Sequence, residues 1–185
     1  MIKNHIFHRD ELAQTPWKNG GGMTREIARS EEGEPYWRLS IADVTQEGGF
    51  STFAGLRRIL TVVEGQGMHL QSPAGDIHAR PREPVSFAGD TPIKGHLVQG
   101  PVQNFNLIYD ANKLKATVYV SNRLDAEETP SLEEGLRLLY CLEGAVETAK
   151  ATSLSYHSGI INPSAPILCA SPDSLFLNIE MTPIA

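Results

Sequence analysis

Residues 37–44 read WRLSIADV, and their side chains alternate in character along the chain. Because successive side chains of a β-strand point to opposite faces, this pattern predicts a strand with two unlike faces. One face carries Trp37, Leu39 and Ile41, which suits an apolar core. The other face carries a smaller and partly polar set: Arg38, Ser40, Ala42 and Val44. We expect this second face to border a cavity.

The strand signal recurs along the rest of the chain. β-Branched or alternating runs occur at residues 58–63, 103–109 and 175–181. Sixteen glycines and twelve prolines interrupt these runs at short intervals, as turns do. Helical spacing occurs only around residues 132–139, where Pro130 and Gly135 oppose a helix. The sequence therefore predicts an all-β fold, either a barrel or a sandwich.

A weak internal repeat sharpens this prediction. Residues 55–57 (GLR) begin an apolar run that ends in Glu64-Gly65, and residues 135–137 (GLR) begin one that ends in Glu143-Gly144. Residues 105–109 (FNLIY) in the first copy correspond to residues 176–180 (FLNIE) in the second. Each copy is expected to be a set of short strands with a Glu-Gly hairpin turn.

Two such copies indicate two cupin-like barrels in tandem, each a double-stranded β-helix. We expect the first barrel, with the ligand pocket, to span residues 1–110 and the second to span residues 111–185. Polar connections are expected at residues 110–115 and 123–131. Because no Ser/Gly-rich linker marks a flexible join, strands can be exchanged between the halves.

Composition excludes several classes of partner. Sixteen Lys and Arg side chains against 22 Asp and Glu give a formal charge of -6, and no window concentrates the bases, so nucleic acid is not an expected partner. Residues 1–9 lack the apolar run of a signal peptide, and no run of about 18 apolar residues occurs, so neither export nor a membrane partner is expected. We predict a cytoplasmic protein. Cys141 and Cys169 lie in apolar surroundings, which is typical of buried free thiols, with a disulfide as the alternative.

Residues 16–28 read PWKNGGGMTREIA and allow two interpretations. Three successive glycines can expose backbone N–H groups as a nest for an anion, with the charge of Lys18 and the amide of Asn19 beside them and Trp17 as a flat wall. Alternatively, Asn19-Gly20 is a common type I′ hairpin signal, and the segment is a tight turn.

Further charged side chains are candidates for the same site. Thr24 and Glu26 share one face of a strand, and a Glu26 carboxylate buried there needs a partner such as Arg38 or Arg58. For both arginines, recognition of a ligand carboxylate and an ordinary surface or interface charge are the two alternatives.

Metal and nucleophilic chemistry are not expected in this pocket. The six histidines lack the spacing of a cupin metal site, since His69, His96 and His157 have no ligand two positions away. No GxSxG segment occurs, and neither cysteine has a histidine nearby in sequence. We therefore expect no metal and no cofactor.

The segment at residues 16–28 also resembles the HutD/Ves family, ancillary proteins often associated with bacterial histidine utilisation. Further family segments follow in order at residues 37–42 (WRLSIA), 49–58 (GFSTFAGLRR), 87–90 (FAGD) and 100–106 (GPVQNFN). The resemblance spans about half the chain. It departs at Asn104, where the family commonly has an acid, and at Tyr109-Asp110, where basic residues are frequent.

The resemblance implies a bicupin that binds a small anionic metabolite, such as urocanate, formiminoglutamate or formylglutamate, and modulates histidine utilisation. The alternatives are a metal-free cupin isomerase or hydrolase with Glu26 as its base, and a partner-binding module whose second barrel makes a homodimer. The expected ligand-binding residues are Trp17, Lys18, Asn19, Gly20, Gly21, Gly22, Thr24, Glu26, Arg38, Ser51, Phe53 and Arg58.

Overall fold

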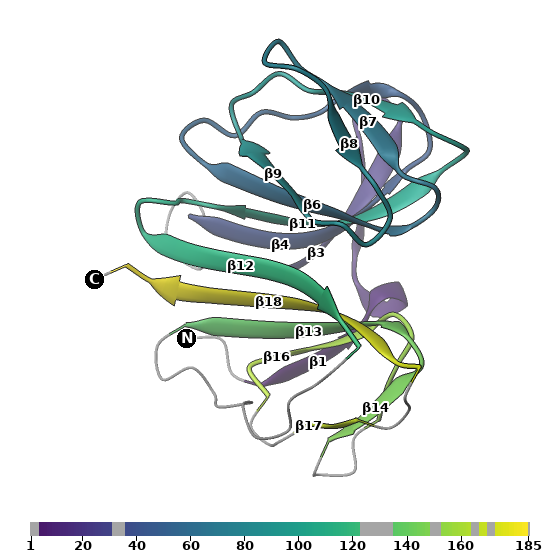
Figure 1. Ribbon diagram of the computed structural model, residues 1–185, viewed down its shortest axis with the longest axis vertical. Coiled ribbons are helices and arrows are strands. Elements are labelled where there is room, and N and C mark those ends of the chain that lie inside the picture. Colours follow the sequence, from purple (N-terminus) through teal and green to yellow (C-terminus); the bar gives the residue numbers. More distant parts are fainter. Residues whose placement is uncertain are drawn as a thin grey trace. The chain divides into compact units, whose positions relative to one another are not determined.

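The computed structural model of the chain is an all-β structure, as the sequence predicts (Figure 1). It describes residues 4–30, 36–122, 135–148, 153–163, 167–169 and 173–184. Within these ranges the single helical element is a 3₁₀ turn, Arg9–Glu11, and no helix is long and apolar enough to span a membrane. The helical spacing around residues 132–139 is misleading over its described part, because a strand begins at Leu136.

The strands divide into two compact units. We call Leu12–Asn112 the first unit, and Met1–Glu11 together with Lys113–Ala185 the second unit. The expected boundary after residue 110 lies close to this change of unit, but the first eleven residues belong with the C-terminal part. The reason is β1 (His5–His8), which pairs antiparallel with β16 (Ser158–Ile161). The connection expected at residues 123–131 lies outside the described residues.

The first unit contains two antiparallel sheets. The six strands of the larger sheet are, in spatial order, β2 (Gln14–Pro16), β3 (Gly22–Arg29), β4 (Trp37–Val44), β11 (Val102–Tyr109), β6 (Arg57–Glu64) and β9 (Val85–Ala88). The four strands of the smaller sheet are β5 (Gly48–Gly49), β10 (Lys94–Leu97), β7 (Met68–Gln71) and β8 (Ile77–Ala79). The strand predicted at residues 37–44 is β4, and the runs at 58–63 and 103–109 fall in β6 and β11.

The second unit also contains a larger and a smaller antiparallel sheet. The larger sheet has the order β1, β16, β13 (Leu136–Glu143), β18 (Leu175–Pro183) and β12 (Leu114–Ser121). The smaller sheet has the order β15 (Ser153–Ser155), β14 (Ala145–Thr148) and β17 (Ile167–Cys169). The run at residues 175–181 falls in β18.

The internal repeat corresponds to equivalent strand pairs in the two units. β6 pairs antiparallel with β11, and β13 pairs antiparallel with β18. Gly65 and Gly144 follow β6 and β13 with φ of 91° and 73°, a region that glycine enters without steric strain. In both copies the Glu-Gly turn leads from the larger sheet to the smaller one, so the expected hairpin turn is wrong although the two turns are equivalent.

The interior of the first unit changes from apolar to polar along β6. Leu60 and Val62 belong to a buried core with Met68 and Leu70 of β7, and each is at most 1% exposed. Removing a large side chain from such a core costs about 2–5 kcal/mol. Arg58 precedes Leu60 by two residues on the same face of β6, where this rigid core gives way to polar groups.

Cys141 is a buried free thiol, as expected. Burial raises its pKa to about 11, so the thiol keeps its proton at neutral pH. The side chain of Cys169 lies outside the described residues.

Candidate ligand-binding site

The first unit contains a cavity of about 510 Å³. The described residues that line it are Pro16, Trp17, Lys18, Asn19, Thr24, Arg38, Ser40, Ala42, Gly49, Phe50, Ser51, Phe53, Arg58, Asn106 and Ile108. Eight residues predicted from the sequence are among them: Trp17, Lys18, Asn19, Thr24, Arg38, Ser51, Phe53 and Arg58. The other predicted residues, Gly20, Gly21, Gly22 and Glu26, are not.

The larger sheet of the first unit places the polar lining side chains in adjacent rows. Arg38 of β4 and Arg58 of β6 both lie opposite Ile108 of β11. In the next row, Ser40 of β4 lies opposite Asn106 of β11. Directly opposed residues of antiparallel strands share a face, so both guanidinium groups enter the same cavity. The face of residues 37–44 that was expected to border a cavity does so through Arg38, Ser40 and Ala42.

Arg58 is the most deeply buried charged side chain of the cavity, at 8% exposure. Its Nε and Nη2 groups donate hydrogen bonds of 2.9 and 2.6 Å to Asn106 Oδ1. Asn106 Nδ2 donates to Asn104 Oδ1 at 2.8 Å, and Asn104 Nδ2 donates to Met68 Sδ at 3.6 Å. This chain of contacts turns the Asn106 oxygen toward Arg58 and fixes the position of the guanidinium.

Arg58 has no acidic partner among the residues that the structure describes, since none of their carboxylates lies within ion-pair distance of its guanidinium. Instead, Arg58 Cζ lies 4.7 Å from the ring centre of Phe50 and 5.7 Å from that of Phe87. Burial, with a smaller effect from the charge of Arg38, lowers the pKa of Arg58 to about 9. Arg58 is therefore a buried cation at neutral pH, and an anion is the partner that would compensate its charge.

Arg38 is the second cation of the cavity and is less buried. Its guanidinium carbon lies 5.6 Å from the centre of the Phe53 ring. Glu26 Oε2 lies 4.0 Å from Arg38 Nε, and Glu26 Oε1 lies 3.4 Å from Arg29 Nε. Glu26 shares these two partners at the surface, so it neutralises Arg38 only in part.

The expectation of a buried Glu26 is wrong, because the residue is exposed. The pairing of β2 with β3 reaches only as far as Arg25, so β3 is the edge of the sheet from Glu26 onward. A bulge between Glu26 and Ala28 also breaks the regular register there. Glu26 consequently does not line the cavity and is poorly placed to act as a base within it.

The glycine segment forms the hairpin connection between β2 and β3. The Gly20 amide donates to the Trp17 carbonyl at 3.0 Å, and the Gly21 amide donates to Asn19 Oδ1 at 3.1 Å. Because these two amides already have partners within the loop, their contacts do not favour the expected anion nest. Asn19 has no positive φ, so the turn is not the type I′ turn either. A Cβ at Gly22 would lie 2.2 Å from the Asp43 carbonyl oxygen, which explains the glycine there.

The same loop holds Trp17 as one wall of the cavity. Its Nε1 donates a hydrogen bond to Thr24 Oγ1 at 2.8 Å. Its ring packs edge to face against the Phe50 ring, with 6.3 Å between the ring centres. Lys18 and Ser51 are exposed lining residues near this wall. The described lining thus offers three cations, Lys18, Arg38 and Arg58, several hydroxyl and amide groups, and no carboxylate.

Sequence reasoning missed several lining residues, above all Phe50 and Asn106. β11 is buried at every position, yet Asn104 and Asn106 alternate on one of its faces. Polar amides at alternate positions of a fully buried strand are a signal for a built polar site, because buried amides require partners. Phe50 carries no comparable signal.

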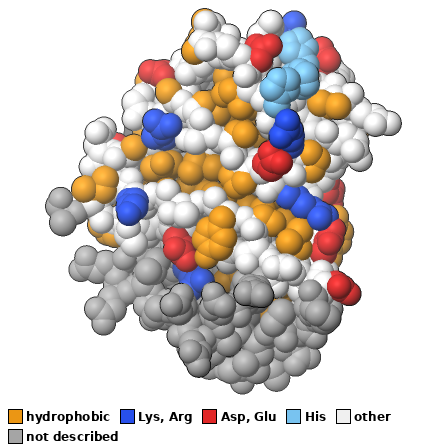
Figure 2. All heavy atoms as spheres, in the orientation of Figure 1, with side chains coloured by type: hydrophobic (Ala, Val, Ile, Leu, Met, Phe, Trp, Pro, Cys, Tyr) orange, Lys and Arg blue, Asp and Glu red, His pale blue; other side chains and the backbone are white. Residues whose placement is uncertain are grey.

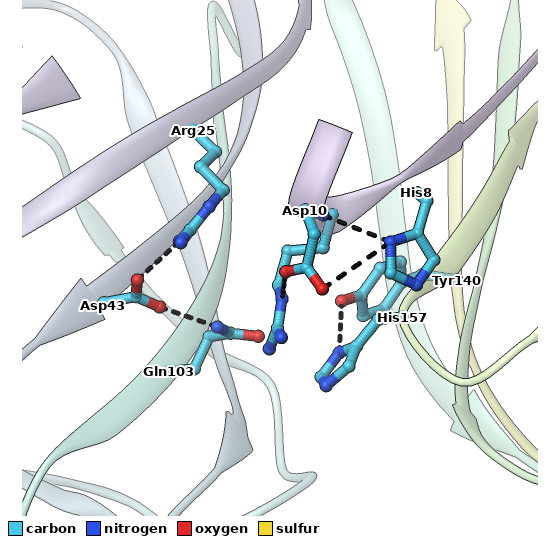
Figure 3. A network of polar contacts seen from close by, with 8 residues as sticks. His8, Asp10, Arg25, Asp43, Gln103, Tyr140 and His157 are labelled. Carbon is cyan, nitrogen blue, oxygen red and sulfur yellow. Dashed lines mark hydrogen bonds and ion pairs between the residues drawn. The ribbon is translucent and has the colours of Figure 1, made fainter. Parts of the chain in front are cut away.

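Polar groups outside the cavity form compact networks within each unit (Figure 3). In the first unit, Arg25 pairs with Asp43, which also accepts a 2.7 Å hydrogen bond from Gln103 Nε2. In the second unit, the Tyr140 hydroxyl lies 3.0 Å from His157 Nδ1. Among the described residues, no three His, Cys, Asp or Glu side chains converge to hold a metal ion.

Comparison with known proteins places this architecture in a class and a family. Two solved structures resemble it over nearly the whole chain. A conserved protein of unknown function from Pseudomonas aeruginosa PAO1 has a TM-score of 0.80 and 29% identity, covering 98% of this chain and 100% of that chain. HutD from Pseudomonas fluorescens SBW25 has a TM-score of 0.77 and 28% identity, covering 99% and 100%. The fold is all-β and cupin-like.

The sequence profile of the HutD family matches residues 9–177, so the chain belongs to the HutD family. The uncharacterized 21.2 kDa protein in the hutC 3′ region of Pseudomonas putida is 39% identical over 126 residues. That match covers 63% of this chain and 63% of the relative's length.

Proposed function

We propose that this HutD-family chain is a bicupin whose first unit binds a small anionic metabolite in a metal-free cavity and thereby modulates histidine utilisation. The matching strand pairs of the two units support the bicupin description. The partner is a carboxylate-bearing small molecule rather than nucleic acid or a membrane. Action in the cytoplasm and assembly as a homodimer are parts of the same proposal.

Arg58 carries this proposal. A cation held at 8% exposure, fixed by Asn106 and without an acidic partner among the described residues, destabilises the empty site. An anion in the cavity compensates this charge, and the guanidinium fork suits a planar carboxylate. Arg38 and Lys18 add positive charge along the same lining.

Family membership directs the choice of ligand. It links the chain to histidine utilisation, and urocanate, formiminoglutamate and formylglutamate all carry carboxylates. The structure of HutD from Pseudomonas fluorescens SBW25 was obtained in a formate condition, and formate is the smallest carboxylate. Aromatic walls at Trp17, Phe50 and Phe53 suit a ligand with a flat portion.

Calorimetric titration with each of the three metabolites tests the proposal. Arg58→Ala should weaken binding by at least about 2 kcal/mol, or about thirtyfold, because the pairing is desolvated. Arg57→Ala is the matched control: it removes the same charge from the preceding position of β6, where the side chain is exposed and contacts Ser86. Equal affinities of the two variants would remove Arg58 from the site.

A thermal melt gives a second measurement. A metabolite at one hundred times its Kd should add about 2.7 kcal/mol to the free energy of unfolding. If none of the three stabilises the chain, these metabolites are not its ligands. Turnover of any of them would instead favour the alternative of a cupin isomerase or hydrolase.

A further inference from the structure

Three histidines lie in a row across the smaller sheet of the first unit. His69 of β7 lies opposite His78 of β8 on one side and opposite His96 of β10 on the other. Opposed residues of antiparallel strands share a face, so the three imidazoles share the outer face of the sheet, away from the buried Met68 and Leu70. Figure 2 shows histidine side chains gathered on the surface over β7 and β8.

His69 and His78 are in hydrogen-bond contact, at a nitrogen separation that two ligands of one metal ion also have. His69 Nε2 and His78 Nδ1 lie 3.2 Å apart, and the rings are nearly perpendicular, at 79°. Two imidazole nitrogens that each lie about 2.1 Å from a shared ion are separated by about 3.0 Å at a right angle and about 3.4 Å at a tetrahedral angle. The observed separation falls between these values, so the pair can bind an ion with little movement of the backbone.

His96, the third histidine of the row, contacts an acid through one ring nitrogen. Its Nδ1 lies 3.0 Å from Glu47 Oε2. A carboxylate at one ring nitrogen fixes the tautomer and leaves the other nitrogen, Nε2, with a free lone pair. As the side chains stand, no third His, Cys, Asp or Glu of the described residues converges with the first two. His96 therefore reaches the ion only after a side-chain rotation.

We propose that His69 and His78 form a surface site for a divalent late first-row transition metal, such as Zn²⁺ or Ni²⁺. Water completes the coordination, and His96 can replace one water. Imidazole ligands favour these ions over Mg²⁺ and Ca²⁺, which prefer oxygen. None of the three histidines lines the cavity, so this site stands apart from the proposed anion-binding function.

Titration of the untagged full-length chain with Zn²⁺ alone, at neutral pH, tests the site. We expect one ion per chain at this site, and His69→Gln or His78→Gln should each weaken binding at least about tenfold, because each removes one of the two imidazoles that already lie close together. Glu47→Gln and His96→Gln should have smaller effects. His5→Gln is the matched control, because it removes an exposed histidine from β1 of the second unit.

Unchanged Zn²⁺ affinity in the His69→Gln/His78→Gln double variant would overturn the proposal, as would an equal loss in His5→Gln. Circular dichroism of each variant establishes that it is folded, which is expected because both side chains are exposed. Ni²⁺ added to the unmodified protein gives a readout that needs no variant. It should broaden the ring resonances of His69 and His78 first, and broadening confined to other histidines would also refute the site.

Discussion

The bulges that precede Glu64 of β6 and Glu143 of β13 align Arg58 with Arg137 and Asn106 with Asn178, one residue away from the alignment of the Gly-Leu-Arg segments. The two units compensate this arginine differently. In the first unit Arg58 lies opposite Ile108, and in the second unit Arg137 lies opposite Glu180. Arg137 Nη2 is 3.5 Å from Glu180 Oε1, whereas Arg58 has no acid within ion-pair distance among the described residues. One arginine is thus neutralised from within the chain, and the other has no compensating acid among the described residues, which is the charge that the proposed anion would meet.

The neighbouring asparagines reinforce this difference. Nδ2 of both Asn106 and Asn178 donates at 3.4 Å to the backbone carbonyl two residues earlier, but Asn106 also accepts both hydrogen bonds from Arg58. Asn104 supports Asn106, and Phe176 occupies the corresponding position of β18. A repeated framework therefore carries an arginine bound to an asparagine in one copy and an arginine paired with an acid in the other.

The largest effect on anion affinity is expected when the first unit receives an acid at the position equivalent to Glu180. Ile108→Glu places a carboxylate opposite Arg58, where it should pair with the guanidinium and compete with any bound anion. We expect anion affinity to fall at least about a hundredfold in calorimetry. Ile108→Gln, which has the same shape without the charge, should retain more affinity. Equal losses in both variants would show that space rather than charge decides binding.

Replacing Arg137 and replacing Arg58 should change the free energy of unfolding by different amounts. Arg137→Met leaves the Glu180 carboxylate without its cation and should lower the free energy of unfolding by about 2 kcal/mol. Arg58→Met removes an uncompensated charge, which offsets the lost hydrogen bonds to Asn106, so a change of less than about 1 kcal/mol is expected. Urea titration measures both. A larger loss for Arg58→Met would contradict the contrast.

The pH dependence of binding should follow Arg58. Raising the pH above about 9 removes its proton and its charge, so anion affinity should be flat near neutrality and fall by up to about tenfold per pH unit beyond that point. A bound anion favours the protonated form and therefore raises the pKa in the complex. Titrations from pH 7 to 10.5 show this, with Arg57→Ala expected to have the same profile. Constant affinity throughout would show that Arg58 keeps its proton up to pH 10.5.

The smallest effect is expected at Glu26. Its contacts with Arg29 and Arg38 lie at the surface, so Glu26→Gln should change anion affinity by less than about fivefold. Arg29→Gln serves as the control, because it removes the other partner of Glu26. If the variant abolished turnover of a metabolite, Glu26 would be a base after all.

The sequence was sufficient for the features that depend on local pattern. Alternation over residues 37–44 predicted β4 and its cavity-lining face, and the repeated Gly-Leu-Arg segments predicted equivalent strands. Residue type and the family resemblance together brought Arg58 into the predicted site, and it lines the cavity.

Features that depend on long-range register could not be predicted in this way. Asn106 and Arg58 are 48 residues apart in sequence, and only the pairing of β6 with β11 brings them together. The glycine amides were expected to face a ligand, but closure of the hairpin gave those of Gly20 and Gly21 partners within the loop. The edge position of Glu26 depends on where β2 begins, a boundary that no local pattern marks.

The fixed amide of Asn106 also limits which chemical groups can enter. A guanidinium carries five N–H donors and no acceptor. Asn106 Oδ1 takes one hydrogen from Nε and one from Nη2, so three hydrogens of Arg58 still point elsewhere. A ligand group that approaches Arg58 meets only N–H donors. A protonated amine would be repelled there, whereas a carboxylate or formyl oxygen could accept a hydrogen bond. The site therefore selects ligands by the charge and the hydrogen-bonding character of the group that approaches Arg58.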